Sequence, residues 1–597
     1  MGVEKIQELT GYPSIDKPWL KYYTQEELAV SLPRMTLYQN IWRNNKDYPN
    51  DPAILYFGKR ISYGELFRQI DECAVALRKN GVKKGDCVTL CTAGTPEAIM
   101  IVLACNKLGA LANFLNPLFT MEQMIDRIND TEAKLLFVLD KVYGRIADVL
   151  EKTCIRQVIV MPVYHSMPQP KKLLVSLQKK DPRMARALKQ GKNHQSWQAF
   201  LRKGQGAAPQ EYASLESPYK PDTPAVMVYS SGTTGASKGI VLTNDGILST
   251  AYNKNIPPDP IKRNDTFLQM IPIWFSTGIV ISIFIPLIYG SIVISEPVFS
   301  KESFVRDLKC YRPNMTLTAT SLWLYAVNAK ELEGINFSQM NCPITGGEKV
   351  LEKDEFKINA FLNSHGCKTK LYKGYGMCEL GGTVTSTSDA VGYSDQYLSS
   401  GYPIRGVCVS AFNITTNQEM QYGMRGEIRV SSPSSMKYYY KNDQATNEFF
   451  YTDEHGVKWG RTGDIGYVDE DGNVFILGRA SDSFTADNGE LVYNFDAEGV
   501  ILQDDRVTAC KALGVNVNGK TIPVAHIQLR DGVQDTFANV VRDIDAQCRK
   551  ALPPCAVPMA YKQRDSFPVH PNGKRDVQSL KQERNDFVDS NGNQIKL

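Results

Sequence analysis

The feature that most constrains the fold of this chain is an alternation of short apolar runs and helical repeats in its first third. Apolar runs typical of buried strands occupy residues 87–91, 135–139 and 157–160. Apolar residues recur at helical spacing over residues 66–77, before these runs, and over 97–108, between the first two. Strand–helix alternation of this kind predicts parallel sheets covered by helices, so we expect an α/β fold.

Length and composition limit the domain organisation and the class of function. A chain of 597 residues is too long for one compact core, so we expect at least two domains. The net charge of +4 is too small to indicate a nucleic-acid-binding protein. The 13 cysteines are scattered without a C-x-x-C pair, and no apolar signal core opens the chain. Reduced thiols of this kind predict a cytoplasmic protein.

The second half of the chain changes character twice. Residues 401–478 contain short β runs separated by turns, which predicts an antiparallel or β-barrel-like subdomain. After about residue 480 the pattern becomes mixed, with a strand, a helix near 537–552 and a basic tail. We therefore expect a large N-terminal domain over residues 1–480 and a small α+β domain over residues 481–597.

A basic segment at about residues 164–205 interrupts the alternation. It carries ten lysines and arginines against one acid, Asp181, and its leucines recur at helical spacing. The interpretation that we favour is a solvated helical insertion, because charge runs are usually solvated. The alternative is a basic amphipathic surface that makes weak peripheral contacts with anionic lipid.

A loop rich in glycine and hydroxyl side chains follows the apolar run 224–229 and precedes another apolar run at 240–242. Glycines let backbone N–H groups turn toward one point, hydroxyl groups donate further hydrogen bonds, and a lysine adds positive charge. The loop therefore predicts a polyphosphate site, although no glycine directly precedes the lysine as in a P-loop. Its candidate ligands are Ser230, Ser231, Gly232, Thr233, Thr234, Gly235 and Lys238.

A second glycine-rich motif follows a predicted strand at 368–372. Its glycines, Gly374 and Gly376, allow a ligand to approach the backbone, and Tyr375 offers a flat face for a base. Glu379 offers a carboxylate for Mg²⁺, which ATP chemistry requires. A similar turn lies upstream, at Gly346, Gly347 and Glu348.

Two more distant segments add candidate groups. Asp464 is a natural acceptor for ribose hydroxyls, and Arg479 is a donor to the same sugar. Lys574 lies in a Pro-Asn-Gly-Lys run near the C-terminus, on a loop that can reach into a site on another domain. Its ammonium group would neutralise charge that develops on a phosphate.

These four motifs, in this order, resemble those of the adenylate-forming superfamily, which includes acyl- and aryl-CoA synthetases. The resemblance implies that Tyr375 stacks on adenine and that Asp464 and Arg479 hold the ribose. It implies that Glu379 and Thr234 hold Mg²⁺ and that Lys574 is the adenylation lysine. The other cofactor-binding positions that it implies include Met377 and Cys378, the latter standing where threonine is usual.

The resemblance also assigns residues to the acyl and CoA sites. Trp274, Phe275 and Gly278 would line the acyl pocket, with Phe275 in place of a frequent histidine. Gly489 would line the pantetheine tunnel after the small domain rotates about a hinge at Ser481 and Asp482.

We therefore expect a ligase that converts a carboxylic acid, fatty or otherwise apolar, into an acyl-CoA through acyl-AMP, with ATP, Mg²⁺ and CoA. One alternative is an adenylating enzyme that loads the phosphopantetheine of a carrier protein. Another is a nucleotide-binding protein with a degenerate site. Dependence of the reaction on CoA separates the first two, and carboxylate-dependent pyrophosphate release separates both from the third.

Overall fold

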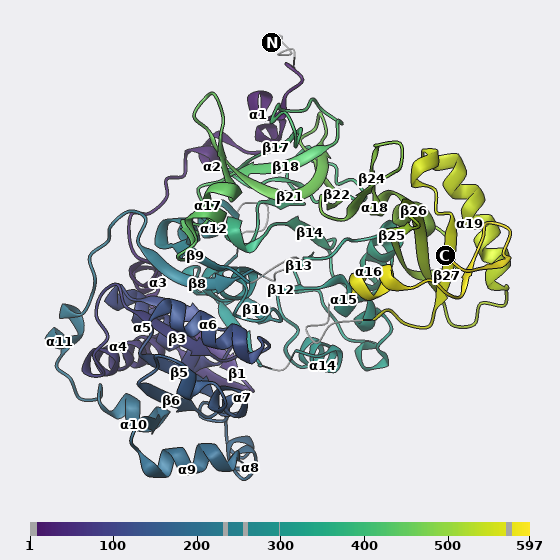
Figure 1. The fold of residues 1–597 in the computed structure, drawn as a ribbon. Coiled ribbons are helices and arrows are strands. Elements are labelled where there is room, and N and C mark those ends of the chain that lie inside the picture. The colour runs from purple at the N-terminus through teal and green to yellow at the C-terminus, as the bar shows by residue number, and fades with distance from the viewer. Residues whose placement is uncertain (1–8, 179, 231–236, 255–260, 298, 569–575) are drawn as a thin grey trace, which may run out of the picture.

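The computed structural model of the protein describes residues 9–178, 180–230, 237–254, 261–297, 299–568 and 576–597 (Figure 1). Two large sheets form most of the N-terminal part of the chain. The third sheet adjoins them, and a smaller fourth body carries the C-terminus. The mixed α/β fold with parallel sheets is thus confirmed.

The first large sheet has eight strands, and all neighbours from β8 to β7 are parallel. In spatial order they are β19 (Tyr438–Tyr439), β9 (Gly239–Thr243), β8 (Pro224–Tyr229), β4 (Leu111–Phe114), β3 (Cys87–Cys91), β5 (Leu135–Leu139), β6 (Gln157–Met161) and β7 (His194–Ser196). The antiparallel β9 returns from the glycine-rich loop, and β19 pairs with it from 200 residues further along the chain.

The second large sheet has nine strands, parallel from β14 to β1 and antiparallel at both edges. In spatial order they are β16 (Tyr402–Pro403), β15 (Thr385–Ser386), β14 (Tyr372–Tyr375), β13 (Cys342–Gly346), β12 (Met315–Thr318), β10 (Thr266–Gln269), β11 (Ile292–Ser295), β1 (Pro52–Tyr56) and β2 (Lys59–Ser62).

Helices pack between and around these sheets. Ser62 caps the first long helix, and Thr95 followed by Pro96 begins the next, which ends at the left-handed Gly109. The largest buried core joins both sheets, with Ile54 from one and Leu90 from the other. The helices are α1 (Pro13–Asp16), α2 (Gln25–Ala29), α3 (Leu37–Asn45), α4 (Tyr63–Lys79), α5 (Pro96–Leu108), α6 (Met121–Thr131), α7 (Tyr143–Ala147), α12 (Asn244–Lys254), the π-helix η3 (Thr277–Phe284), α13 (Ile285–Ile288), α14 (Lys301–Tyr311), α15 (Thr320–Val327), α16 (Glu352–Ser364) and α17 (Asp443–Phe449), with short 3₁₀ turns η1 (Pro18–Tyr22), η2 (Leu150–Lys152), η4 (Lys330–Leu332) and η5 (Cys378–Leu380).

The insertion folds as short helices on the outer edge of the first sheet (Figure 1). They are α8 (Lys171–Ser176), α9 (Pro182–Gln190), α10 (Trp197–Arg202) and, just beyond, α11 (Pro209–Ser214). The predicted helical character of this segment is therefore confirmed.

The β-rich region is an antiparallel five-stranded sheet, as its turns predict. It consists of β17 (Cys408–Phe412), β18 (Gly426–Ser431), β21 (Lys458–Val468) and β20 (Phe450–Thr452) in that order, with β22 (Val474–Arg479) paired to β21. Residues 461–464 lie inside the long β21 strand.

The C-terminal part forms its own small α+β unit, with buried clusters drawn from its own residues. It contains the hairpin β23 (Ser483–Thr485) and β24 (Leu491–Tyr493), the sheet β25 (Val507–Val517), β26 (Lys520–Leu529), β27 (Ala560–Arg564), β28 (Phe587–Val588) and β29 (Gln594–Ile595), the helices α18 (Asn494–Ile501), α19 (Phe537–Ala551) and α20 (Val577–Gln582), and the turn η6 (Pro554–Ala556). A large N-terminal and a small C-terminal domain are thus present, and the boundary at residue 480 stays a prediction.

One predicted element is displaced. The strand expected at 368–372 begins only at Tyr372 and continues through Gly374 and Tyr375. Because β14 pairs with β13 on one side and β15 on the other, the first glycine of the motif, Gly374, lies inside the sheet. The motif is therefore the end of a strand, and its turn begins at Gly376.

Candidate active site

Two adjoining cavities lie where β8, β13 and β14 end and where β21 and β22 cross toward them. The larger has a volume of about 980 Å³ and the smaller about 270 Å³. Gly376 and Arg479 line both, so the cavities meet at the glycine turn. The described parts of the motifs from Ser230 to Arg479 thus converge, although they are spread over more than 200 residues of the chain.

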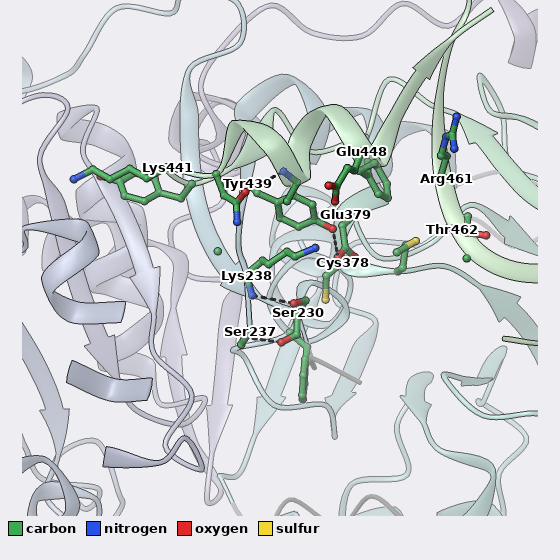
Figure 2. Close-up of a pocket in the computed structure, with 18 of the residues that line it drawn as sticks. Ser230, Ser237, Lys238, Cys378, Glu379, Tyr439, Lys441, Glu448, Arg461 and Thr462 are labelled. Atoms are coloured by element: carbon green, nitrogen blue, oxygen red, sulfur yellow. Dashed lines mark hydrogen bonds between the residues drawn. The ribbon is translucent and has the colours of Figure 1, made fainter. Parts of the chain in front are cut away.

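The base of the glycine-rich loop is closed by hydrogen bonds between its two ends. The Ser230 hydroxyl accepts from the backbone N–H of Lys238 at 3.0 Å, and the Ser237 hydroxyl donates to the Ser230 carbonyl at 2.7 Å (Figure 2). Both ends therefore enter the larger cavity together with Lys238. The remaining predicted phosphate ligands, Ser231, Gly232, Thr233, Thr234 and Gly235, lie outside the described residues.

Glu379 lies in the same cavity, held from two sides. The Tyr439 hydroxyl donates to its carboxylate at 2.8 Å, and the Met436 backbone N–H donates to its carbonyl at 2.7 Å. The Lys238 ammonium lies 4.9 Å from the centre of the Tyr439 ring, and Figure 2 shows the lysine extending toward this pair. A carboxylate, a phenol and an ammonium group thus form one cluster on the cavity wall.

Burial sets the protonation behaviour of Glu379. Loss of hydration raises the pKa of this carboxyl group, while the Tyr439 hydrogen bond, Arg479 and Lys238 oppose that rise. A buried carboxylate with a raised pKa gains from a nearby cation. Mg²⁺ is usually held by one or two carboxylates together with substrate phosphates, so this buried carboxylate beside the predicted phosphate loop fits the ion.

The residues predicted to bind the nucleoside, Tyr375, Asp464 and Arg479, lie together at the smaller cavity. The Tyr375 hydroxyl donates to Asp464 at 2.6 Å, and the Arg479 guanidinium is paired with the same carboxylate at 3.0 Å. The antiparallel register places Asp464 directly opposite Arg479. Burial raises the pKa of Asp464, and the charge of Arg479 opposes the rise. The hydrogen bond to Asp464 therefore fixes the position of the Tyr375 ring in the wall of the smaller cavity.

The glycines admit close approach of a ligand or of backbone. Gly347 has a φ of +78°, in the left-handed region, and lines the smaller cavity beside Glu348. A Cβ on Gly376 would lie 2.4 Å from the Gly382 carbonyl oxygen, so this position excludes any side chain. Gly374 also lines the smaller cavity, and Gly346 is the last residue of β13.

Of the three residues predicted to line the acyl pocket, only Phe275 lines one of the two cavities. It lies in the larger cavity, together with Met377 and Cys378 from the predicted cofactor site. Trp274 is buried in the core, and a Cβ on Gly278 would lie 2.0 Å from the Pro272 carbonyl oxygen. Gly278 therefore serves the close turn into the π-helix η3, and neither residue is among those that line the two cavities.

Cys378, which replaces a usual threonine, is a neutral thiol. Burial raises its pKa to about 11. It therefore acts as a small polar wall residue and not as a thiolate nucleophile at neutral pH.

The hinge candidates lie between the two domains. Asp482 accepts from the Asn494 amide at 2.8 Å and is paired with Lys511 at 2.6 Å, whereas Ser481 is exposed. Gly489 ends a turn of the β23–β24 hairpin with φ +85° and is not among the lining residues of either cavity. Lys574 lies outside the described residues.

Tyr439 was not among the sequence candidates. It comes from β19, which joins the first sheet only through its pairing with β9. A Tyr-Tyr-Tyr run at 438–440 is the only local signal in the sequence, and it does not indicate which ring faces Glu379.

Asn244, at a position where the resembled family often has histidine, is buried and accepts from Leu37 N–H and the Asn106 amide, both at 2.8 Å.

Comparisons with known proteins show the family to which the chain belongs. A sequence profile of a family described as AMP-binding enzyme matches residues 41–440. The chain is 24% identical to a long-chain-fatty-acid–CoA ligase of Bacillus subtilis, over 94% of this chain and 96% of that protein. It is 27% identical to a 2-succinylbenzoate–CoA ligase of Bacillus licheniformis, over 88% and 95% respectively.

Solved structures share the fold. The crystal structure of ATP-bound MatB from Rhodopseudomonas palustris superimposes with a TM-score of 0.74, at 22% identity, over 92% of this chain and 98% of that one. Among the described residues, no helix has both the length and the apolar character needed to span a bilayer.

Proposed function

Since this chain belongs to the AMP-binding enzyme family and is an acid–thiol ligase, we propose that it activates an apolar carboxylic acid as acyl-AMP and transfers the acyl group to CoA. One observation carries the proposal: the Lys238–Tyr439–Glu379 cluster and the Tyr375–Asp464–Arg479 cluster occupy adjoining cavities that share Gly376. Two adjoining cavities lined in this way suit the two ends of one nucleotide, the polyphosphate and the nucleoside.

In the first step, a carboxylate oxygen attacks the α-phosphorus of ATP, the bond to the β-phosphate breaks, and pyrophosphate leaves. Asp464 accepts hydrogen bonds from the ribose, and Tyr375 provides a face for adenine. Lys238 and the 230–237 loop bind the outer phosphates, where positive charge offsets the charge that moves onto pyrophosphate. Bound Mg²⁺, held by Glu379 and Thr234, would supply further charge neutralisation there. Lys574 is the proposed partner of the α-phosphate and the acid.

In the second step, the CoA thiol attacks the acyl carbonyl carbon, AMP leaves, and the thiol proton is released. A rotation about Ser481 and Asp482 is proposed to exchange Lys574 for the Gly489 turn at the site. Phe275, Met377 and Cys378 give the acyl side of the larger cavity an apolar to weakly polar wall. This wall favours an apolar chain or ring, in line with the fatty and aromatic acids in the names of the relatives.

The test separates the two steps. Pyrophosphate release is measured with ATP, Mg²⁺ and a panel of fatty and aryl acids, with and without CoA, and thioester is measured in parallel. We expect Lys574→Ala to lose pyrophosphate release by about 100-fold or more, because a charge-stabilising donor is typically worth that factor. Preserved release in this variant would refute the assignment of Lys574.

Gly489→Leu should retain pyrophosphate release and lose thioester formation. Its matched control is Gly519→Leu, because both glycines lie in left-handed turns of the small domain, with φ of +85° and +84°, and neither Cβ position has an atom within 4 Å. Equal loss of thioester in both variants would contradict a specific role for Gly489. Release by the wild type without any CoA thioester would instead indicate a carrier-protein acceptor.

A further inference from the structure

In the insertion, the helix α8 and its C-cap residue, Leu177, turn three leucines outward. The exposed fractions of Leu173, Leu174 and Leu177 are 56%, 64% and 74%. A single exposed leucine is ordinary, but three within five positions at helical spacing form a patch. We call residues 173, 174 and 177 the leucine patch.

The other side of α8 fixes this orientation. Val175 packs against the main core, and the Lys172 ammonium donates to the His165 carbonyl at 2.8 Å. The neighbouring helix α9 differs, because it buries Met184 and packs Ala187 and Leu188 against the core of the first sheet. The outward leucines are thus a property of α8 and not of the whole insertion.

Basic residues lie on both sides of the leucine patch in the sequence. Arg183 is paired with Asp148 and Asp181, so its charge is offset. Five other basic side chains have no ion pair among the residues that the structure describes, and all five are exposed. These unpaired cations are Lys171, Lys180, Arg186, Lys189 and Lys192.

We propose that α8 and α9 form a docking surface for an anionic lipid bilayer. The leucine patch enters the boundary between headgroups and acyl chains, and the unpaired cations contact lipid phosphates. Cations alone would suit any polyanion, but the exposed leucines favour a partner with an apolar layer beneath its charged surface, as a bilayer has. Figure 1 places α8 and α9 at an outer end of the molecule, away from the C-terminal domain, so the surface is accessible there.

This proposal does not depend on the ligase reaction, and it reverses the preference for a merely solvated insertion. The sequence alone shows the leucines at helical spacing and leaves open whether they are buried. Their exposure supplies the apolar component that electrostatic attraction needs for stable binding.

The test is cosedimentation of the full chain with vesicles of phosphatidylcholine, with and without phosphatidylglycerol. We expect the protein to pellet with the anionic vesicles and to dissociate as the salt concentration rises. The variant Leu173→Gln/Leu174→Gln/Leu177→Gln should bind these vesicles at least about tenfold more weakly than the wild type. The variant Arg186→Glu/Lys189→Glu/Lys192→Glu should lose binding by a comparable factor or more.

Matched controls remove exposed groups elsewhere. Val391→Gln/Met559→Gln replaces apolar residues that are 95% and 60% exposed and far from the insertion, and should bind as wild type. Circular dichroism and the thermal midpoint establish that each variant is folded. Failure of the folded wild type to pellet with anionic vesicles would overturn the proposal. Undiminished binding of the leucine variant would also overturn it and leave a surface that binds polyanions only.

Discussion

At the scale of single residues, the cluster around Glu379 shows how one side chain can serve two functional groups. The Tyr439 hydroxyl donates to the buried carboxylate, and the face of the same ring lies beneath the Lys238 ammonium. Tyr439 therefore holds Glu379, the proposed metal ligand, and Lys238, the proposed phosphate ligand, in a fixed relation. The proposed reaction gives it no role at the reacting atoms, so we regard it as a positioning residue.

Replacing Tyr439 by phenylalanine separates these two contacts. The ring below Lys238 remains, while the buried Glu379 carboxylate loses a hydrogen bond worth about 1.5–3 kcal/mol when the partner is charged. We expect Mg²⁺-dependent ATP binding, measured by calorimetry, to weaken by roughly tenfold, with little change in metal-free ATP binding. Tyr438→Phe is the matched control, since no hydrogen bond of its hydroxyl occurs among the described residues. Equal Mg²⁺ dependence in Tyr439→Phe and wild type would show that the hydroxyl does not position Glu379.

At the scale of elements, much of the site was predictable because its motifs are local. The glycine-rich loop between β8 and β9 and the opposed Asp464 and Arg479 follow from strand runs and the turn between β21 and β22. Tyr439 was not predictable in the same way, because the two-residue strand β19 acquires its place only through pairing with β9. The outward direction of α8 was hidden for a similar reason, since packing decides which face of a short helix is buried.

The turn after β14 depends on the absence of a side chain at Gly376. A Cβ there would meet the Gly382 carbonyl oxygen at 2.4 Å and the Thr383 Cα at 2.6 Å, both of them backbone atoms that cannot rotate away. The turn would have to shift, and Met377, Cys378 and Glu379 would shift with it.

We therefore expect Gly376→Ala to destabilise the protein by about 1–3 kcal/mol, as overpacking of a filled site does. ATP affinity, measured by calorimetry, should fall as well, because the turn lies between the two cavities. The control is Gly499→Ala in α18, where a Cβ meets no atom within 4 Å and alanine favours the helix. The thermal midpoint of this control should not decrease. A wild-type midpoint and ATP affinity in Gly376→Ala would contradict the steric argument.

At the scale of the whole molecule, few polar contacts join the small domain to the large one among the residues that the structure describes. Lys353 of α16 donates to the Leu502 carbonyl at 3.1 Å, and Arg425 is paired with Asp496 at 2.9 Å. Lys511 binds Asp482 and Glu498 at 2.6 and 2.8 Å, all on the C-terminal side of β22. A limited set of polar contacts across the boundary is what a domain that rotates would need.

The small domain also carries a buried group that should make its stability depend on pH. His526 of β26 is fully buried, and its Nδ1 atom accepts from the Arg564 guanidinium at 3.0–3.1 Å. Burial, and then the positive charge of Arg564, lower the pKa of this imidazole to about 3. The folded protein therefore keeps His526 neutral at pH values where an unfolded chain protonates it.

The sign of the effect follows from the two protonation states. Below its ordinary pKa of about 6.5, His526 binds a proton in the unfolded chain but not in the folded one, so stability is lost as the pH falls through this range. The loss from this residue amounts to about 2 kcal/mol between pH 7 and pH 5. Scanning calorimetry should show a drop in the melting temperature over this interval that is smaller in His526→Gln. His455→Gln, which removes an exposed imidazole, should retain the wild-type dependence. If His526→Gln and wild type lose equal stability on acidification, the buried imidazole does not set the acid limit of the small domain.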